Sequence, residues 1–150
     1  MIEQKNIWFI KIYRNNKYFE IMERKTLENK SIGIGYNGMY FDIKNKTNQE
    51  INIFMDSLNK TERQKKHIKN VLNNFMNIMK MGDTVFLCKG EYDILYKATI
   101  SSDYYYDVSG GDLKNELNSF WCHRRNISNI EPYEIKSSKR RIQTLYKELS

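Results

Sequence analysis

The sequence predicts an α+β fold built on a small, strongly bent or barrel-like β-sheet. Strand-like and helix-like segments both occur, but too few strands alternate with helices for a doubly wound parallel sheet. Apolar residues make up 40% and aromatic residues 13% of the 150-residue chain, which is enough for one sizeable core. One proline, seven glycines and no visible repeat or linker indicate a single domain over residues 1–150.

The first third of the chain is expected to form a strand, a short helix and a second strand. The segment "NIWFIKIYR" alternates and is rich in β-formers, which is typical of a strand. In "KSIGIGY", Gly33 and Gly35 weaken a second strand but permit close approach of another backbone. The expected bounds are a strand over 6–14, a helix over 17–25, a strand over 30–36 and a loop over 37–43.

The remaining elements are predicted to be helices and a β-hairpin. Thr61 and Gln64 match a capping box, and apolar residues then recur at helical spacing. Two β-rich segments are joined around Gly90 as a hairpin. The expected bounds are helices over 49–59 and 61–79, hairpin strands over 83–90 and 92–100, a strand over 120–130 and a basic helix over 137–149.

The charge of the chain favours a polyanionic partner. Lys and Arg number 25 against 18 Asp and Glu, so the net charge is +7. Basic domains of this size often bind nucleic acid, because Lys and Arg neutralise phosphates and release counterions. No apolar run has the length of a membrane span, and the first residues lack a signal-peptide layout. We therefore expect a cytoplasmic protein without membrane contact.

No pattern in the sequence predicts an enzyme. Cys88 and Cys122 fit no metal-ligand spacing, so no metal and no cofactor are expected. The two histidines, His67 and His123, belong to no recognisable catalytic order. The segment "SIGIGYNG" lacks the ending of a phosphate-binding loop, and nuclease-like carboxylate–lysine patterns are missing.

Several separated motifs together resemble one family. In order they are "IWFIKIYR", "IGIGYNG", "MKMGDTVFLCKG", "ATISSDYYYD" and "HRRNISNI", over roughly residues 7 to 130. This set resembles the PUA-like superfamily that contains the EVE and YTH domains. It is most similar to the reader domains at the N-termini of modification-dependent restriction enzymes. Tyr36 stands where that family usually has Trp, and Asn129 stands near the position of a second Trp.

The resemblance implies a strongly bent β-barrel with flanking helices that binds and does not catalyse. A modified base, such as a methylated one, would be flipped out of the nucleic acid into an aromatic pocket. Double-stranded DNA is the favoured ligand and RNA the alternative. The resemblance also implies a role in defence, with a fused or associated nuclease or motor protein. The pocket candidates are Tyr36, Trp8, Tyr104, Tyr106 and Trp121, with Asn37 and Asp103 placed to bond a base edge.

Each aromatic candidate has a competing structural interpretation. Side chains alternate along a strand, so Tyr104 and Tyr106 share one face while Tyr105 points elsewhere. One ring of the shared face is then expected in the core and one at an opening. Trp8 lies in an apolar strand, where packing in the core is the common role.

The basic cluster "HRR" is predicted to contact phosphate. Arg binds phosphate bidentately, which suits a clamp on the nucleic-acid backbone. Cations of the C-terminal segment and of the helix over 61–79 would extend this surface, although a solvated charged face is the plainer interpretation of that helix. The predicted phosphate-binding residues are His123, Arg124, Arg125, Lys139, Arg140 and Arg141.

Two other classes of function remain open from the sequence. In one, the domain is a protein-interaction or regulatory module whose basic surface docks an acidic partner, and the aromatics only pack the core. In the other, the same pocket binds a small molecule or nucleotide. A base reader differs from both in its preference for one modified oligonucleotide.

Overall fold

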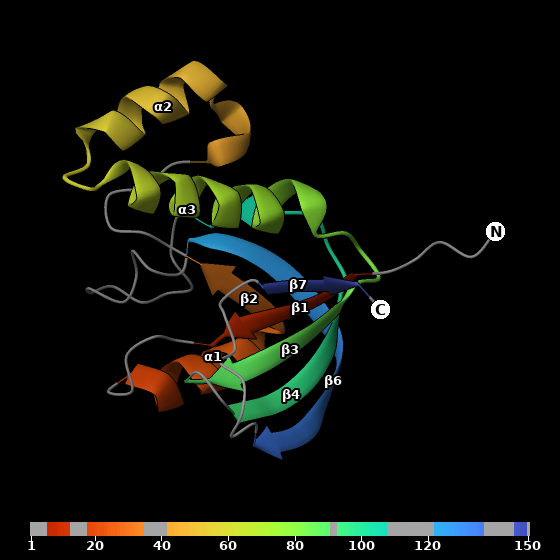
Figure 1. Cartoon of the computed structure of the whole chain (residues 1–150). Helices are drawn as coiled ribbons and strands as arrows, with labels where there is room; N and C mark the ends of the chain where they lie inside the picture. Colours follow the sequence, from red (N-terminus) through yellow and green to blue (C-terminus); the bar gives the residue numbers. More distant parts are fainter. Residues whose placement is uncertain are drawn as a thin grey trace.

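The structure is a computed structural model, and it describes residues 6–12, 18–34, 42–90, 93–107, 122–136 and 146–149. Within these ranges it has an α+β fold with a strongly curled mixed β-sheet, which confirms the predicted class. Helices α2 and α3 stack over one end of the sheet, and α1 lies near the other end (Figure 1). No helix in the described ranges is long and apolar enough to cross a membrane.

Most elements lie where the sequence predicts them, with shifted ends. The bounds are β1 Asn6–Lys11, α1 Phe19–Asn29, β2 Ser31–Ile34, the 3-10 helix η2 Ile43–Asn45, α2 Asn48–Ser57, α3 Glu62–Asn73, the π-helical turn η3 Asn74–Ile78, β3 Thr84–Lys89, β4 Asp93–Ile100, β5 Tyr105–Tyr106, β6 His123–Lys136 and β7 Tyr146–Leu149.

The sheet runs in the order β2-β6-β4-β3-β1-β7, and β5 pairs with the start of β6. Strands β1 and β3 are parallel, and the other described pairs are antiparallel. The register between β4 and β6 shifts twice, and that between β3 and β4 shifts once. Each shift marks an irregularity of the β-bulge type, which bends a strand and increases its twist. These shifts explain the curl of β6 around the sheet in Figure 1.

The predicted strand over 120–130 is longer at its C-terminal end than the sequence indicates, because β6 continues to Lys136. Pro132 has no N–H to give to a ladder, so a proline usually argues against a central strand. Here Pro132 pairs with Tyr96 next to a register shift, where the regular ladder is already interrupted. Asn129 adopts a left-handed backbone with φ of 51° at the other irregular stretch.

The predicted C-terminal helix is wrong where the structure describes that segment. Tyr146–Leu149 forms β7, which pairs antiparallel with β1 from Phe9↔Tyr146 to Asn6↔Leu149. The edge of β1 offers unpaired backbone groups, and satisfying them outweighs the weak helical preference of a four-residue segment. Residues 137–145 lie outside the described ranges.

The core fills the concave side of the sheet and is closed by the helices. Trp8 and Ile10 of β1, Leu87 of β3, Met22 of α1 and Phe75 of η3 are all nearly inaccessible to solvent. The predicted capping box at the start of α3 is present, since Thr61 and Gln64 bond each other's backbone N–H. The end of the α3–η3 segment contacts the start of β6, where Arg125 bonds the carbonyl oxygens of Phe75 and Met79.

Candidate functional site

Three of the separated motifs meet at the start of β6. His123 is the register partner of Ile34 on β2 and of Tyr106 on β5. Tyr36 follows Ile34 by two residues but lies outside the described ranges. Strand pairing thus joins the start of "IGIGYNG", the tyrosine run and "HRRN" in space, although up to about ninety residues of sequence separate them.

Tyr104 is the buried ring of this site. Its hydroxyl lies 2.7 Å from Nδ1 of His123, and the two rings stack with centroids 5.9 Å apart. The hydroxyl also accepts a hydrogen bond from the backbone N–H of Ile43, at 3.4 Å. The edge of Tyr104 meets Phe75 beneath α3. These contacts hold Tyr104 and His123 in one orientation.

Tyr106 also contacts the ring of His123 and stays partly exposed. Its ring centroid lies 5.4 Å from that of the imidazole, with a tilt of 49°. Tyr105 points elsewhere, and its hydroxyl donates to Oδ1 of Asn126. The predicted division of the tyrosine run is confirmed: Tyr104 packs inward, and Tyr105 leaves the face that Tyr104 and Tyr106 share.

Asp42 and Lys44 also belong to this site, and sequence reasoning missed both. The main-chain N–H of Lys44 donates to the Asp42 side chain at the start of η2, and the Lys44 ammonium donates to the main-chain oxygen of Tyr104 at 3.3 Å. The sequence signal here is Asp42, because an Asp side chain often accepts from the backbone N–H two residues on and so forms a turn. Such a turn does not predict contact with Tyr104. We call Asp42, Tyr104, Tyr106 and His123 the Tyr104–His123 cluster.

The phenols of this cluster are held in the neutral form. Burial raises the pKa of Tyr106 to about 12, and the nearby Cys122 thiol, Asp42 and Asp107 act in the same direction. Burial also raises the pKa of Tyr104, with a smaller contribution from the Asp42 carboxylate. Neutral phenols can both donate and accept hydrogen bonds, so the cluster combines aromatic faces with polar edges.

Tyr106 gives a pH-dependent prediction. Its pKa is near 10 when unfolded and about 12 when folded, so the folded state favours the protonated phenol. This contribution to the free energy of unfolding is complete below pH 10 and is lost as the pH rises toward 12. Urea midpoints measured across that range should fall more steeply for the wild type than for Tyr106→Phe. Identical slopes would contradict the raised pKa.

Arg125 spans the core between β6 and the end of the α3–η3 segment. Its side chain is 1% exposed. One terminal nitrogen donates to the carbonyl oxygens of Phe75 and Met79, at 2.9 and 2.6 Å. The remaining described bonds go to the carbonyl oxygen of Ser102, at 3.1 and 2.8 Å. Burial lowers the pKa of this guanidinium. It caps the free carbonyls at a helix end, as a cation does well.

Arg124 faces the opposite side of β6 and is also enclosed. It is 4% exposed, forms an ion pair of 3.2 Å with Asp107 and donates to the hydroxyl of Ser31. His123 is fully buried. A phosphate would reach these three side chains only after a rearrangement of their contacts with the protein.

The other predicted site residues are not gathered at the cluster. Trp8 is fully buried on β1, three strands away from β6, and its indole N–H donates to Oδ2 of Asp83 at 2.9 Å. Asp103 is exposed in the bend before Tyr104. The predicted residues outside the described ranges are Tyr36, Asn37, Trp121, Lys139, Arg140 and Arg141.

The part of the chain that the structure describes gives one observation on metal binding and one on the thiol of Cys88. No group there of three or more His, Cys, Asp or Glu side chains could hold a metal ion. Cys88 is buried, and this burial raises its pKa to about 12, so it is a poor nucleophile near neutral pH.

The comparisons with known proteins identify a family without an assigned activity. A family model described as a domain of unknown function, DUF8426, matches residues 8–148. A search of curated proteins finds no match to the chain. The matched range includes both the Tyr104–His123 cluster and helix α3, so these features lie within the family domain.

Proposed function

We propose a base-reading function for this chain, which belongs to the DUF8426 family of domains of unknown function. In this proposal the domain binds nucleic acid and recognises a modified base that is flipped toward the Tyr104–His123 cluster. The observation that carries it is the convergence of β2, β5 and β6 at His123, which joins three motifs of the PUA-like resemblance. The curled sheet is consistent with such a fold.

The chemistry of the cluster supports this proposal energetically. Flipping a base costs a few kcal/mol, and stacking on an aromatic side chain returns about 1–3 kcal/mol per base. Tyr106 offers a partly exposed ring beside the polar groups of Asp42 and His123. A buried methyl group would add about 0.8 kcal/mol. Together these contributions would yield modest discrimination of a methylated base.

DNA is proposed over RNA because the motif set resembles the readers linked to restriction enzymes. By the same resemblance, a nuclease or motor protein would act on the DNA that this domain has bound. No catalytic step is assigned to the domain itself, and the cluster serves binding alone.

Fluorescence anisotropy with short labelled duplexes tests the proposal. The probes are unmodified DNA and DNA with N6-methyladenine, 5-methylcytosine or 5-hydroxymethylcytosine, each with a matched RNA. We expect a preference of about tenfold for one modified base, or about 1.4 kcal/mol. Tyr106→Ala should abolish this preference, and so should Tyr36→Ala. Tyr105→Ala is the matched control, because its side chain leaves the shared face.

The alternative outcomes are distinct. Equal, salt-sensitive binding to all probes would contradict base reading and leave only contact with the backbone. No binding to any probe would also contradict it and would favour docking of an acidic protein partner. Loss of the preference in Tyr105→Ala as well as in Tyr106→Ala would indicate a general structural effect.

A further inference from the structure

Helix α3 exposes a face made of Arg, Lys, His and Asn side chains. Its positions recur three, four and seven residues apart, so they share one side of the helix. Opposite them, Ile68, Val71 and Phe75 are buried in the core. Asn77 donates to Asn73 at 2.8 Å, which extends the face into η3. We call this surface the α3 face, and it consists of Arg63, Lys66, His67, Asn70, Asn73 and Asn77, all exposed.

The carboxylates near α3 are segregated from this face. Glu62 and Asp56 both bind the ammonium of Lys65, at 2.6 and 3.1 Å, on the side that meets α2. No Asp or Glu occurs from residue 63 to residue 82. Within the described ranges, neither Arg63 nor Lys66 forms an ion pair. The positive charge of the α3 face is therefore not neutralised by described neighbours.

Helix α1 shows that this sorting is not a general property of the chain. It has a similar length and also exposes charged residues, but acids and bases are interspersed there, as in Glu20, Arg24 and Glu28. A mixed pattern of this kind is typical of a solvated surface helix. The separation of basic from acidic residues on α3 therefore makes this surface favourable for a ligand of opposite charge.

We propose that the α3 face binds the phosphate backbone of nucleic acid. Lys and Arg neutralise phosphates, and Asn side chains donate hydrogen bonds to phosphate oxygens without reading sequence. From Arg63 to Asn77 the helix extends about 21 Å, enough to follow several phosphates of one strand.

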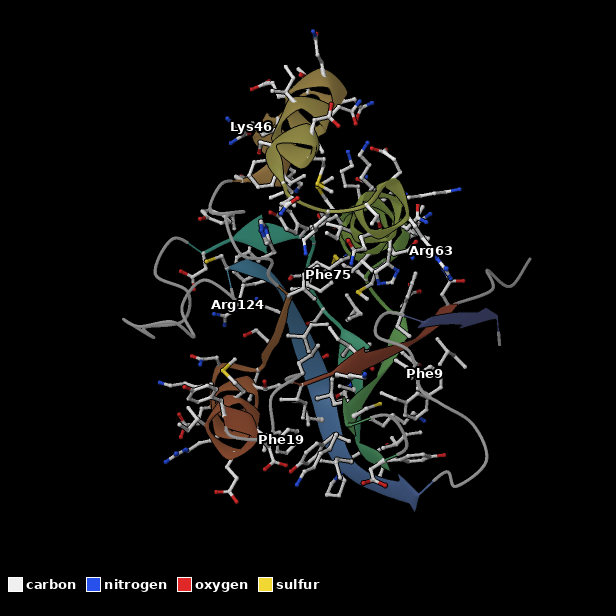
Figure 2. All side chains as sticks on the ribbon, turned by 60° about the vertical axis from the view of Figure 1, so that its left-hand side comes forward. Phe9, Phe19, Lys46, Arg63, Phe75 and Arg124 are labelled. Atoms are coloured by element: carbon white, nitrogen blue, oxygen red, sulfur yellow. The ribbon has the colours of Figure 1, made fainter. Side chains whose placement is uncertain are left out.

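The absence of apolar side chains from the α3 face selects this ligand over two others. Amphipathic helices insert large apolar residues into a membrane, and protein interfaces depend on aromatic or aliphatic anchors. The six residues of the α3 face include neither. Figure 2 shows Arg63 on the side of α3 away from Arg124, so Arg63 is separate from that buried arginine of β6. This inference rests on the proposed function in one respect, which is that the ligand is a nucleic acid. It does not depend on the base pocket.

A pair of double variants tests the α3 face. Arg63→Gln/Lys66→Gln removes two charges from α3, and Arg24→Gln/Lys25→Gln removes two from α1. Binding to an unmodified labelled DNA duplex is measured by anisotropy from about 50 to 200 mM salt. The α3 variant should bind about tenfold more weakly at low salt, and its salt slope should be shallower by about 2. The α1 variant should stay close to the wild type.

Several results would overturn this inference. Equal losses of affinity in the two variants would mean that only the net charge of the protein matters. An unchanged affinity of the α3 variant would show that the α3 face does not bind the duplex. Binding to phosphatidylserine vesicles by the wild type and not by the α3 variant, with no binding of either to the duplex, would assign the face to a membrane. The free energies of unfolding of both variants must match that of the wild type to within about 0.5 kcal/mol, as is usual for surface substitutions.

The same variant separates this inference from base reading. It should weaken modified and unmodified probes equally and leave their ratio unchanged. If the wild type shows no preference for any modified base but its affinity depends on α3, base reading fails and the α3 face stands. If Tyr106→Ala removes a preference while the α3 variant retains full affinity, the α3 face fails and base reading stands.

Discussion

Replacing Arg125 with Met is expected to lower the free energy of unfolding by about 3–5 kcal/mol, because three buried carbonyl oxygens lose their charged donor. Those oxygens belong to Phe75, Met79 and Ser102, which come from η3, its C-terminal end and the bend after β4. Arg125 is their shared partner in the interior. The loss would be a large part of the total stability of a small domain. Urea denaturation of both proteins measures it.

Two controls sharpen this measurement. Arg24→Met removes an equal charge from the exposed side of α1 and should change stability by less than about 0.5 kcal/mol. Arg125→Lys keeps the charge but lacks the planar fork of donors, so it should recover only part of the loss. Equal effects of Arg125→Met and Arg24→Met would refute the anchoring role of Arg125.

Replacing Asp83 with Ala is expected to cost about 3–4 kcal/mol, because three donors lose a charged acceptor. Its carboxylate accepts from the indole of Trp8 and from the backbone N–H of Lys80, each at 2.9 Å, and from that of Asn6 at 3.3 Å. Asp83 is 4% exposed, so water cannot fully replace these bonds. It ties β1 to the turn before β3. Urea denaturation again gives the change in free energy.

A double-mutant cycle with Trp8→Phe isolates one of these bonds. The two single changes should be less than additive when combined, because each removes the same hydrogen bond. A coupling of about 1–3 kcal/mol is expected for a buried bond to a charged group. Asp83→Asn, which keeps one acceptor oxygen, should be milder than Asp83→Ala. Additive effects would mean that Trp8 contributes only packing.

Local patterns predicted much of the fold correctly. The capping box at Thr61, the hairpin around Gly90 and the β-rich segment after Asn6 all formed at or near their expected positions. Each depends on residues that are close together in the sequence, so the sequence alone predicts it. The alternation of the tyrosine run belongs to the same class, because a strand places successive side chains on opposite faces.

Contacts between segments that are distant in sequence were not predicted by local patterns. Tyr146–Leu149 forms a strand because β1 has an open edge, and no local pattern predicts that pairing. The extension of β6 past Pro132 depended on register irregularities against β4. Likewise, the approach of Lys44 to Tyr104 joins residues 60 positions apart. Tertiary context overrides local preference in each case.

The sequence by itself determined the α+β class, the basic charge, the capping box that begins α3 and the alternation of Tyr104, Tyr105 and Tyr106. These properties follow from composition and from spacing within one element. Only the tertiary structure decided that Arg124 and Arg125 lie inside the protein while Arg63 and Lys66 lie outside it. An arginine has the same charge in either place. Its role depends on whether carbonyl and carboxylate oxygens from other elements surround it, and folding alone brings those oxygens together.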